Sequence, residues 1–411
     1  MQQSRQSIDA SNLDLNFVSV LQQEVDFGAQ ALKQGKPDVA VTFFQSALQK
    51  MTADMPFYDH LVHNLLLSYK QLAEDLLSAG DTETALKFID SALSLEIKGQ
   101  MADDSVFRQR FADAFQGLGL KCFSNAQFDA ALACCRKSIR IFPGPGYHVN
   151  LTNALAATGR RAQLSDYTAD ITPEQLGRHI FIACVPKSAS TFLKNILVNL
   201  TGFKDMFAVY AAVQNEHELY LPVIRESAHL DTVTQQHCRA SEANIHLMQA
   251  FGIRPVVLVR NIFDSVMSLL DFYNKQGAYQ STYFRADFPS LDEETQIDLL
   301  IDNVIPWYFQ FVASWSLVEK QGRLDVLWLS YEELTGDKPA AIERVLNFYG
   351  LGAYEKALEA KIKETESEAR KIRFNKGVAG RGVAGLSEAQ KERIRRLSRY
   401  HPSTDFSRIG L

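Results

Sequence analysis

The segment Pro186-Lys-Ser-Ala-Ser-Thr191 combines a lysine with several hydroxyl side chains. The apolar residues 179–185 before it are typical of a β-strand, and residues 192–200 after it are typical of a helix. The segment is therefore predicted to be a strand-to-helix loop. Backbone N–H groups at the start of a helix bind anions, and Lys187 adds a positive charge to them. The loop lacks the glycine-rich spacing of a nucleotide-triphosphatase P-loop, so it does not indicate ATP bound with magnesium.

A second candidate anion-binding group follows about 70 residues later. Residues 254–259 are predicted to form a buried strand that ends at Arg260 and leads into a helix carrying Ser268. Ligands of open parallel sheets bind in the crevice outside the carboxyl ends of the strands. A guanidinium group in that place can hold a phosphate through two parallel hydrogen bonds.

These two motifs resemble those of the sulfotransferase family, whose members use 3′-phosphoadenosine 5′-phosphosulfate as the donor. Residues 186–193, PKSASTFL, resemble the family's 5′-phosphosulfate loop, and residues 256–268, VVLVRNIFDSVMS, resemble its 3′-phosphate motif. Residues 326–334 are similar to the family's strand ending in YEDL, and residues 374–380 to its late FRKGxxG loop. The resemblance covers about residues 178 to 411 and implies an α/β fold, a P-loop-like parallel sheet with flanking helices.

The resemblance also implies the roles of individual residues. Lys187 would be catalytic, donating to the leaving oxygen of the donor. The residues implied to bind the donor as co-substrate, with no metal, are Lys187, Ser188, Ala189, Ser190, Thr191, Phe192, Arg260, Ser268, Tyr331, Lys376 and Gly377.

Three positions depart from the family pattern. Ala189 stands where the first loop usually has glycine, and Phe192 replaces a tryptophan, although a phenyl ring can still stack on adenine. Asn375 replaces the arginine of the late loop, and either Arg373 or Arg381 is a candidate substitute.

The reaction also needs a base that takes the proton of the acceptor. The resemblance implies a histidine shortly before the 3′-phosphate arginine, and His237 lies 23 residues before Arg260. An imidazole whose pKa lies near the working pH suits this role. His229 and Glu226 are the alternatives.

The predicted activity is transfer of a sulfuryl group to a hydroxylated acceptor. The sequence does not choose among carbohydrate, lipid, phenolic metabolite and protein tyrosine. Two other functions are weighed against this one: a P-loop kinase acting on a small molecule, and a repeat scaffold whose α/β domain is inactive.

The first part of the chain contains a repeated pattern. Residues 40–48, AVTFFQSAL, recur 45 residues later as residues 85–93, ALKFIDSAL, and a weaker copy covers residues 131–139. The pattern resembles the tetratricopeptide repeat and predicts an all-α array of helix pairs. The small residues would let a neighbouring helix approach, and Phe43 and Phe88 would fill the gap beside them.

Such an array has two interpretations. It provides a surface for a protein partner or for self-association, or it is a structural extension without a ligand. The pattern changes after Arg160, which places a tetratricopeptide-like domain at residues 1–170 and a sulfotransferase domain at residues 171–411.

Composition limits the remaining classes of function. The 411 residues carry 43 basic and 48 acidic side chains, a net charge of −5 that gives no general reason to bind nucleic acid. No apolar stretch is long enough for a membrane span, and the polar amino terminus lacks a signal-peptide core, so we expect a cytoplasmic protein. The five cysteines include no CxxC pair and are expected to be reduced, mostly buried thiols.

Overall fold

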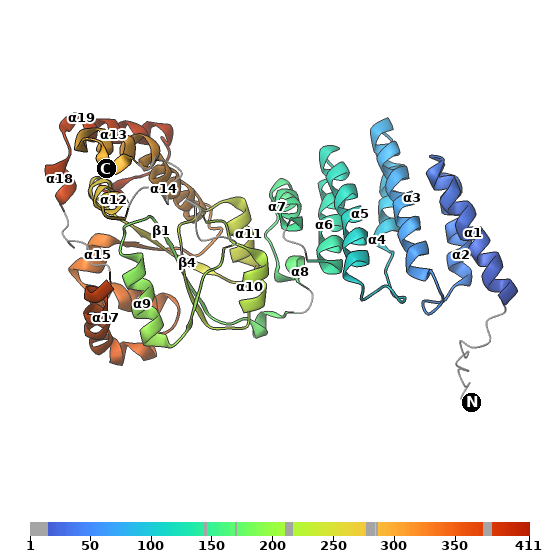
Figure 1. Cartoon of the computed structure of the whole chain (residues 1–411), viewed down its shortest axis with the longest axis horizontal. Coiled ribbons are helices and arrows are strands. Elements are labelled where there is room, and N and C mark those ends of the chain that lie inside the picture. The colour runs from blue at the N-terminus through green and yellow to red at the C-terminus, as the bar shows by residue number, and fades with distance from the viewer. Residues whose placement is uncertain are drawn as a thin grey trace. The chain divides into compact units, whose positions relative to one another are not determined.

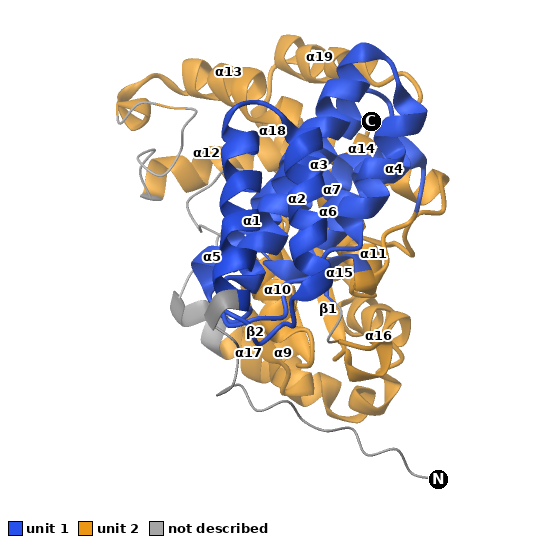
Figure 2. Cartoon of the chain, turned by 90° about the vertical axis from the view of Figure 1, so that its right-hand side faces the viewer, with its two compact units in different colours: residues 1–160, 166–168 blue, residues 161–165, 169–411 orange. Residues whose placement is uncertain are grey.

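The chain forms two compact units. The first comprises Met1–Arg160 and Asp166–Thr168, and the second comprises Arg161–Ser165 and Ala169–Leu411 (Figure 2). The computed structural model describes residues 15–143, 146–168, 171–209, 217–276, 284, 287–372 and 380–411. Within these residues no helix is both long and apolar enough to span a bilayer, and the cysteines, all buried, form no disulfide.

The first unit consists of helices joined by turns and loops (Figure 1). They are α1 (Leu15–Lys33), α2 (Pro37–Lys50), α3 (Tyr58–Ala79), α4 (Thr82–Leu93), α5 (Ser105–Ser124), α6 (Phe128–Ile141), α7 (Tyr147–Thr158) and the second half of the short helix α8 (Leu164–Tyr167). Each helix of the pairs α1–α2, α3–α4 and α5–α6 packs against its partner. Gly80 ends α3 with a φ of 85°, a left-handed conformation that glycine adopts without steric cost.

The repeated small residues are buried where helices meet. Ala40, Ala47, Ala85 and Ala92 have no solvent-exposed surface. The prediction that Phe43 and Phe88 fill the gap beside these alanines was wrong by one position. The next residues in the chain, Phe44 and Ile89, fill the core, whereas Phe43 and Phe88 are half-buried. Adjacent helix positions point about 100° apart, so one residue separates the core from the half-exposed flank.

The second unit is built on a five-stranded, entirely parallel sheet in the order β2-β3-β1-β4-β5. The strands are β1 (His179–Cys184), β2 (Lys204–Met206), β3 (Thr232–Gln236), β4 (Arg254–Val259) and β5 (Leu327–Ser330). Because all strands run the same way, their carboxyl ends meet at one edge of the sheet. The predicted α/β fold with a parallel sheet is confirmed.

Helices flank the sheet. They are α9 (Ser190–Thr201), α10 (Leu221–Ser227), α11 (Glu242–Ala250), α12 (Ile262–Gln276), α13 (Glu293–Asn303), α14 (Ile305–Lys320), α15 (Tyr331–Gly336), α16 (Lys338–Phe348), α17 (Leu358–Ile372), α18 (Arg381–Gly385) and α19 (Glu388–Leu397). Apolar side chains of α9, α16 and α17 pack on one face of the sheet, against alternate residues of β1 and β4 such as Ile182 and Leu258. The alternation follows from the two-residue period of a strand.

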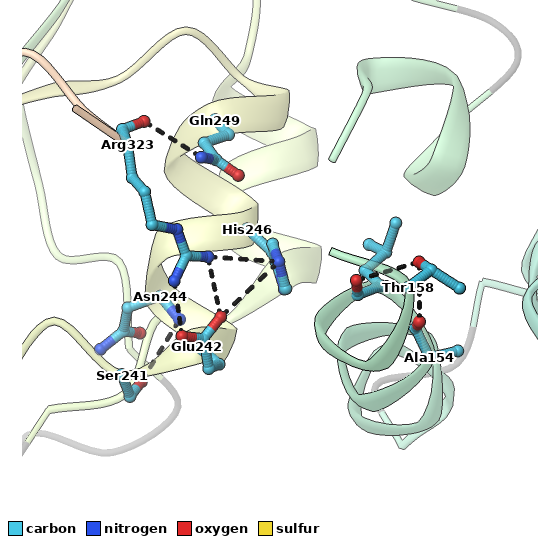
Figure 3. Close-up of polar contacts among 9 residues, drawn as sticks. Ala154, Thr158, Ser241, Glu242, Asn244, His246, Gln249 and Arg323 are labelled. Carbon is cyan, nitrogen blue, oxygen red and sulfur yellow. Dashed lines mark hydrogen bonds and ion pairs between the residues drawn. The ribbon is translucent and has the colours of Figure 1, made fainter. Parts of the chain in front are cut away.

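Polar residues at and near α11 contact the segment that leads into β5 (Figure 3). Ser241 caps the helix by accepting a hydrogen bond from the Asn244 N–H. Arg323, which lies between α14 and β5, donates to both carboxylate oxygens of Glu242 at 2.6 and 2.8 Å. The Arg323 carbonyl also accepts from the Gln249 amide at 3.0 Å. These contacts fix the position at which the chain enters β5.

Candidate active site

The loop after β1 has an unusual backbone. Lys187 and Ala189 have φ angles of 65° and 66°, the left-handed region that residues with a Cβ rarely adopt. Ala189 is the N-cap residue directly before α9, which begins at Ser190. A glycine, which the resemblance implies at this position, would adopt the same angle without the steric cost of a Cβ.

Side chains around the loop hold its shape. Ser188 is fully buried and its hydroxyl donates to the Val185 carbonyl at 2.7 Å, so towards a ligand it can offer only its backbone N–H. Tyr308 of α14 donates to the Pro186 carbonyl at 2.8 Å. The Lys187 ammonium lies 4.5 Å from the centre of the Phe272 ring, a cation–π contact that sequence reasoning missed.

The remaining loop residues differ in exposure. Ser190 is buried and Thr191 is exposed, both at the start of α9 where backbone N–H groups have no partner within the helix. Phe192 is half-buried and packs against the apolar core between α9 and the sheet.

Arg260 joins the loop to the neighbouring strands. It follows β4 directly, is 6% exposed, and donates to the Lys187 carbonyl at 2.9 Å. Its guanidinium lies 4.0 Å from the centre of the Tyr331 ring, which follows β5. The Arg260 Nε is buried and has no hydrogen-bond partner in the part of the chain that the structure describes. A buried cationic donor without a partner is costly, and an anion bound here would satisfy it.

The end of β3 supplies His237. Its Nδ1 lies 2.9 Å from the Cys184 carbonyl oxygen and 3.4 Å from the Cys184 thiol. A carbonyl oxygen only accepts, so Nδ1 carries the proton and Nε2 keeps its lone pair. This is the tautomer that a base acting through Nε2 requires.

A second histidine holds the backbone of the first. The His237 N–H donates to Nδ1 of His217 at 3.0 Å, and the His217 N–H donates to the His237 carbonyl at 2.9 Å. The two rings are 5.4 Å apart, and Phe207 lies edge-on to His217 at 5.3 Å. Sequence reasoning missed Cys184 and His217 because no motif links residues that meet only after the strands align.

The electrostatics of His237 reflect two opposed effects. Burial lowers its pKa, because the charged imidazolium loses solvation. The neighbouring Cys184 raises it by more, through its thiolate charge and its hydrogen bonds, so the pKa of His237 lies above the ordinary 6.5. In turn, burial raises the pKa of Cys184, but the nearby His237 charge and hydrogen bonds outweigh this and lower it.

The two alternative bases lie elsewhere. Glu226 is exposed near the end of α10, and His229 is exposed just before β3 begins. They therefore lie near the amino end of β3, whereas His237 lies at its carboxyl end. A five-residue strand is about 16 Å long, so neither side chain shares the edge that carries Lys187.

Of the other residues implied or weighed for the 3′-phosphate site, Ser268 and Arg381 lie within the described part of the chain. Ser268 is buried on α12, two turns beyond Arg260. Lys376 and Gly377 lie outside the described residues, as do Arg373 and Asn375. Arg381 is described, and it donates to Asp271 of α12 at 2.7 Å.

Comparison with known proteins identifies the class. Residues 177–377 match the family model of the Sulfotransferase domain. None of the curated proteins matches the chain. Among solved structures, the crystal structure of mouse sulfotransferase SULT7A1 complexed with PAP has 15% sequence identity and a TM-score of 0.45, over 58% of this chain and 88% of that chain.

The second unit therefore carries a sulfotransferase domain, and the chain is an enzyme of the sulfotransferase class.

Proposed function

We propose that the chain transfers a sulfuryl group from 3′-phosphoadenosine 5′-phosphosulfate to a hydroxyl of its acceptor. One observation carries this proposal above the others. The adjacent strands β3, β1 and β4 end in His237, the Lys187 loop and Arg260, at one edge of the sheet. Across these strands, the candidate base His237 comes first, the Lys187 loop second and the candidate phosphate ligand Arg260 third. This order matches the sequence of acceptor, sulfuryl group and 3′-phosphate that the reaction needs.

The donor is held by charge and by preformed loop geometry. The backbone N–H groups at the start of α9 and the Lys187 ammonium face the 5′-phosphosulfate. Arg260 binds the 3′-phosphate and gains the partner that its buried Nε lacks. Tyr331, stacked on Arg260, keeps the guanidinium plane oriented.

The transfer follows from these positions. The acceptor oxygen attacks sulfur while its proton passes to Nε2 of His237, and the new oxygen–sulfur bond forms as the bond to the bridging phosphate oxygen breaks. The leaving group is adenosine 3′,5′-bisphosphate, whose developing negative charge is stabilised by Lys187. By analogy with phosphoryl transfer, positioning and charge stabilisation provide most of the catalysis.

The test is turnover with donor labelled in its sulfuryl group, offered with panels of carbohydrate, lipid, phenolic and tyrosine-peptide hydroxyls. We expect label to appear on one acceptor class in the presence of EDTA. Lys187→Met is the control, since it removes the charge needed by the leaving group. Phosphate transfer from ATP that requires magnesium would instead support a kinase, and donor binding without transfer to any class would support an inactive scaffold.

We further propose that residues 1–170 form a tetratricopeptide-like domain for a protein partner or self-association, and that residues 171–411 form the catalytic domain. The buried alanines at equivalent positions of α2 and α4 support the repeat. A chain starting at residue 171 should still bind adenosine 3′,5′-bisphosphate. Loss of its binding, with the chain folded by circular dichroism, would contradict this division.

A further inference from the structure

One face of α12 carries two carboxylates with a serine between them. Asp264, Ser268 and Asp271 are spaced i, i+4 and i+7, so they lie one above another along the helix. Ser268 is the candidate 3′-phosphate ligand two turns beyond Arg260. The groups that Asp264 and Asp271 hold therefore lie close to the phosphate site.

Asp264 anchors the segment that begins α18. The carboxylate is 3% exposed and accepts hydrogen bonds from the N–H groups of Gly380 and Gly382, both at 2.6 Å. The backbone approach is close, because a Cβ at Gly382 would lie 2.2 Å from the Phe263 carbonyl carbon. The backbone of the intervening residue, Arg381, is thereby held against the start of α12.

The Arg381 side chain reaches the other carboxylate. Its Nη1 donates to the Asp271 Oδ2 at 2.7 Å, and both side chains are only partly exposed, 23% and 18%. Seven residues of α-helix span about 10 Å. The arginine thus starts beside Asp264, ends at Asp271, and runs along the face that carries Ser268.

We propose that Arg381 exchanges Asp271 for the 3′-phosphate of the donor, so that Asp271 acts as a counter-ion that holds the arginine beside Ser268 until the donor binds. This inference rests on the proposed function. A phosphate monoester carries a larger negative charge than a carboxylate and accepts bidentate hydrogen bonds from a guanidinium. The exchange also supplies the cation that is absent at Asn375.

The energetic consequence is a competition. Binding of the phosphate must break the Arg381–Asp271 pair, so the aspartate reduces affinity for any ligand that uses the arginine. Removing the competing charge should strengthen binding, whereas removing the arginine should weaken it. The effect of Asp271 should disappear when Arg381 is already absent.

The test is calorimetric titration of the full chain with two nucleotides, adenosine 3′,5′-bisphosphate and adenosine 5′-phosphate, which lacks the 3′-phosphate. Arg381→Gln should weaken binding of the bisphosphate about 10- to 100-fold and leave adenosine 5′-phosphate nearly unchanged. Asp271→Asn should strengthen binding of the bisphosphate about 3- to 10-fold, and should have no effect in the Arg381→Gln background. Arg393→Gln is the matched control, because Arg393 of α19 also pairs with aspartates, Asp298 and Asp302, but these lie on α13.

Two results would overturn the inference. Arg381→Gln could bind the bisphosphate as tightly as the wild type, or it could weaken both nucleotides by the same factor, which would indicate a structural role only. Failure of the wild type to bind the bisphosphate at all would instead count against the proposed function, so the two failures are distinguishable.

Discussion

The Nδ1 of His237 lies 2.9 Å from the carbonyl oxygen of Cys184, the last residue of the central strand. This contact joins the candidate base to the strand that carries the Lys187 loop. It fixes the tautomer that leaves Nε2 with a lone pair. The contact thus ties the candidate base to the neighbouring strand of the same sheet.

The pH dependence of turnover follows from the same contact. His237 acts as a base only when neutral, so kcat/KM should rise with pH through its pKa, at a value above 6.5 because Cys184 raises that pKa. Burial and the Lys187 charge lower the pKa of His237 and so oppose this shift. The His217 ring lies 5.4 Å from the His237 ring. Cys184→Ala removes the thiolate and should move the acid limb to lower pH. An acid limb that stays in place in this variant would contradict the electrostatic role of Cys184.

His217 should affect turnover indirectly, by holding the backbone of His237 in place. An asparagine oxygen can replace Nδ1 as acceptor of the His237 N–H, whereas a leucine cannot. We expect His217→Leu to lower kcat about 10- to 100-fold through misplacement of the base, with affinity for adenosine 3′,5′-bisphosphate unchanged. His217→Asn should retain most of the activity. Equal losses in the two variants would indicate that the His217 ring, not its acceptor nitrogen, matters.

The strained alanine predicts a stabilising substitution. Ala189→Gly should raise the free energy of unfolding by up to about 1 kcal/mol, because glycine adopts a φ of 66° without the Cβ clash. The gain is limited by the larger entropy of glycine in the unfolded chain. Urea denaturation measures the change, and Ala360→Gly, in exposed helix, should lower stability by about 1 kcal/mol. A loss of stability at Ala189 would show that the loop is not strained.

Lys187 and Arg260 should affect different steps. Lys187→Met should lower kcat about 10²- to 10³-fold, since the charge is needed most when the leaving oxygen becomes negative. Arg260→Ala should act mainly on donor affinity, weakening it about 10- to 100-fold through loss of a charge-assisted contact. Steady-state kinetics with varied donor separate the two effects. The same ratio of kcat loss to affinity loss in both variants would contradict this division.

The sequence predicted the parts of the site that are local in the chain. The strands before Lys187 and Arg260 were recognisable from their apolar runs, and the parallel sheet brought those two residues together as expected. Strand order was not predictable in this way, and it is the order that places His237 beside β1.

Contacts between distant elements could not be predicted. Phe272 and Tyr308 reach the Lys187 loop from α12 and α14, and nothing in their local sequence indicates it. The sequence also could not predict which face of α2 is buried. Phe43 and Phe44 are equally apolar, and only the packing of α2 against α1 and α3 determines that Phe44 enters the core. A Cβ on Gly28 of α1 would lie 2.5 Å from the Phe44 ring, which shows how closely that choice is fixed.

The most direct test of the donor assignment is calorimetric titration of the full chain with adenosine 3′,5′-bisphosphate in the presence of EDTA. The arrangement of Arg260, Tyr331 and the Lys187 loop predicts one binding site per chain without metal, with ATP binding more weakly under the same conditions. Absence of heat with the bisphosphate, or tighter binding of ATP that requires magnesium, would contradict the account.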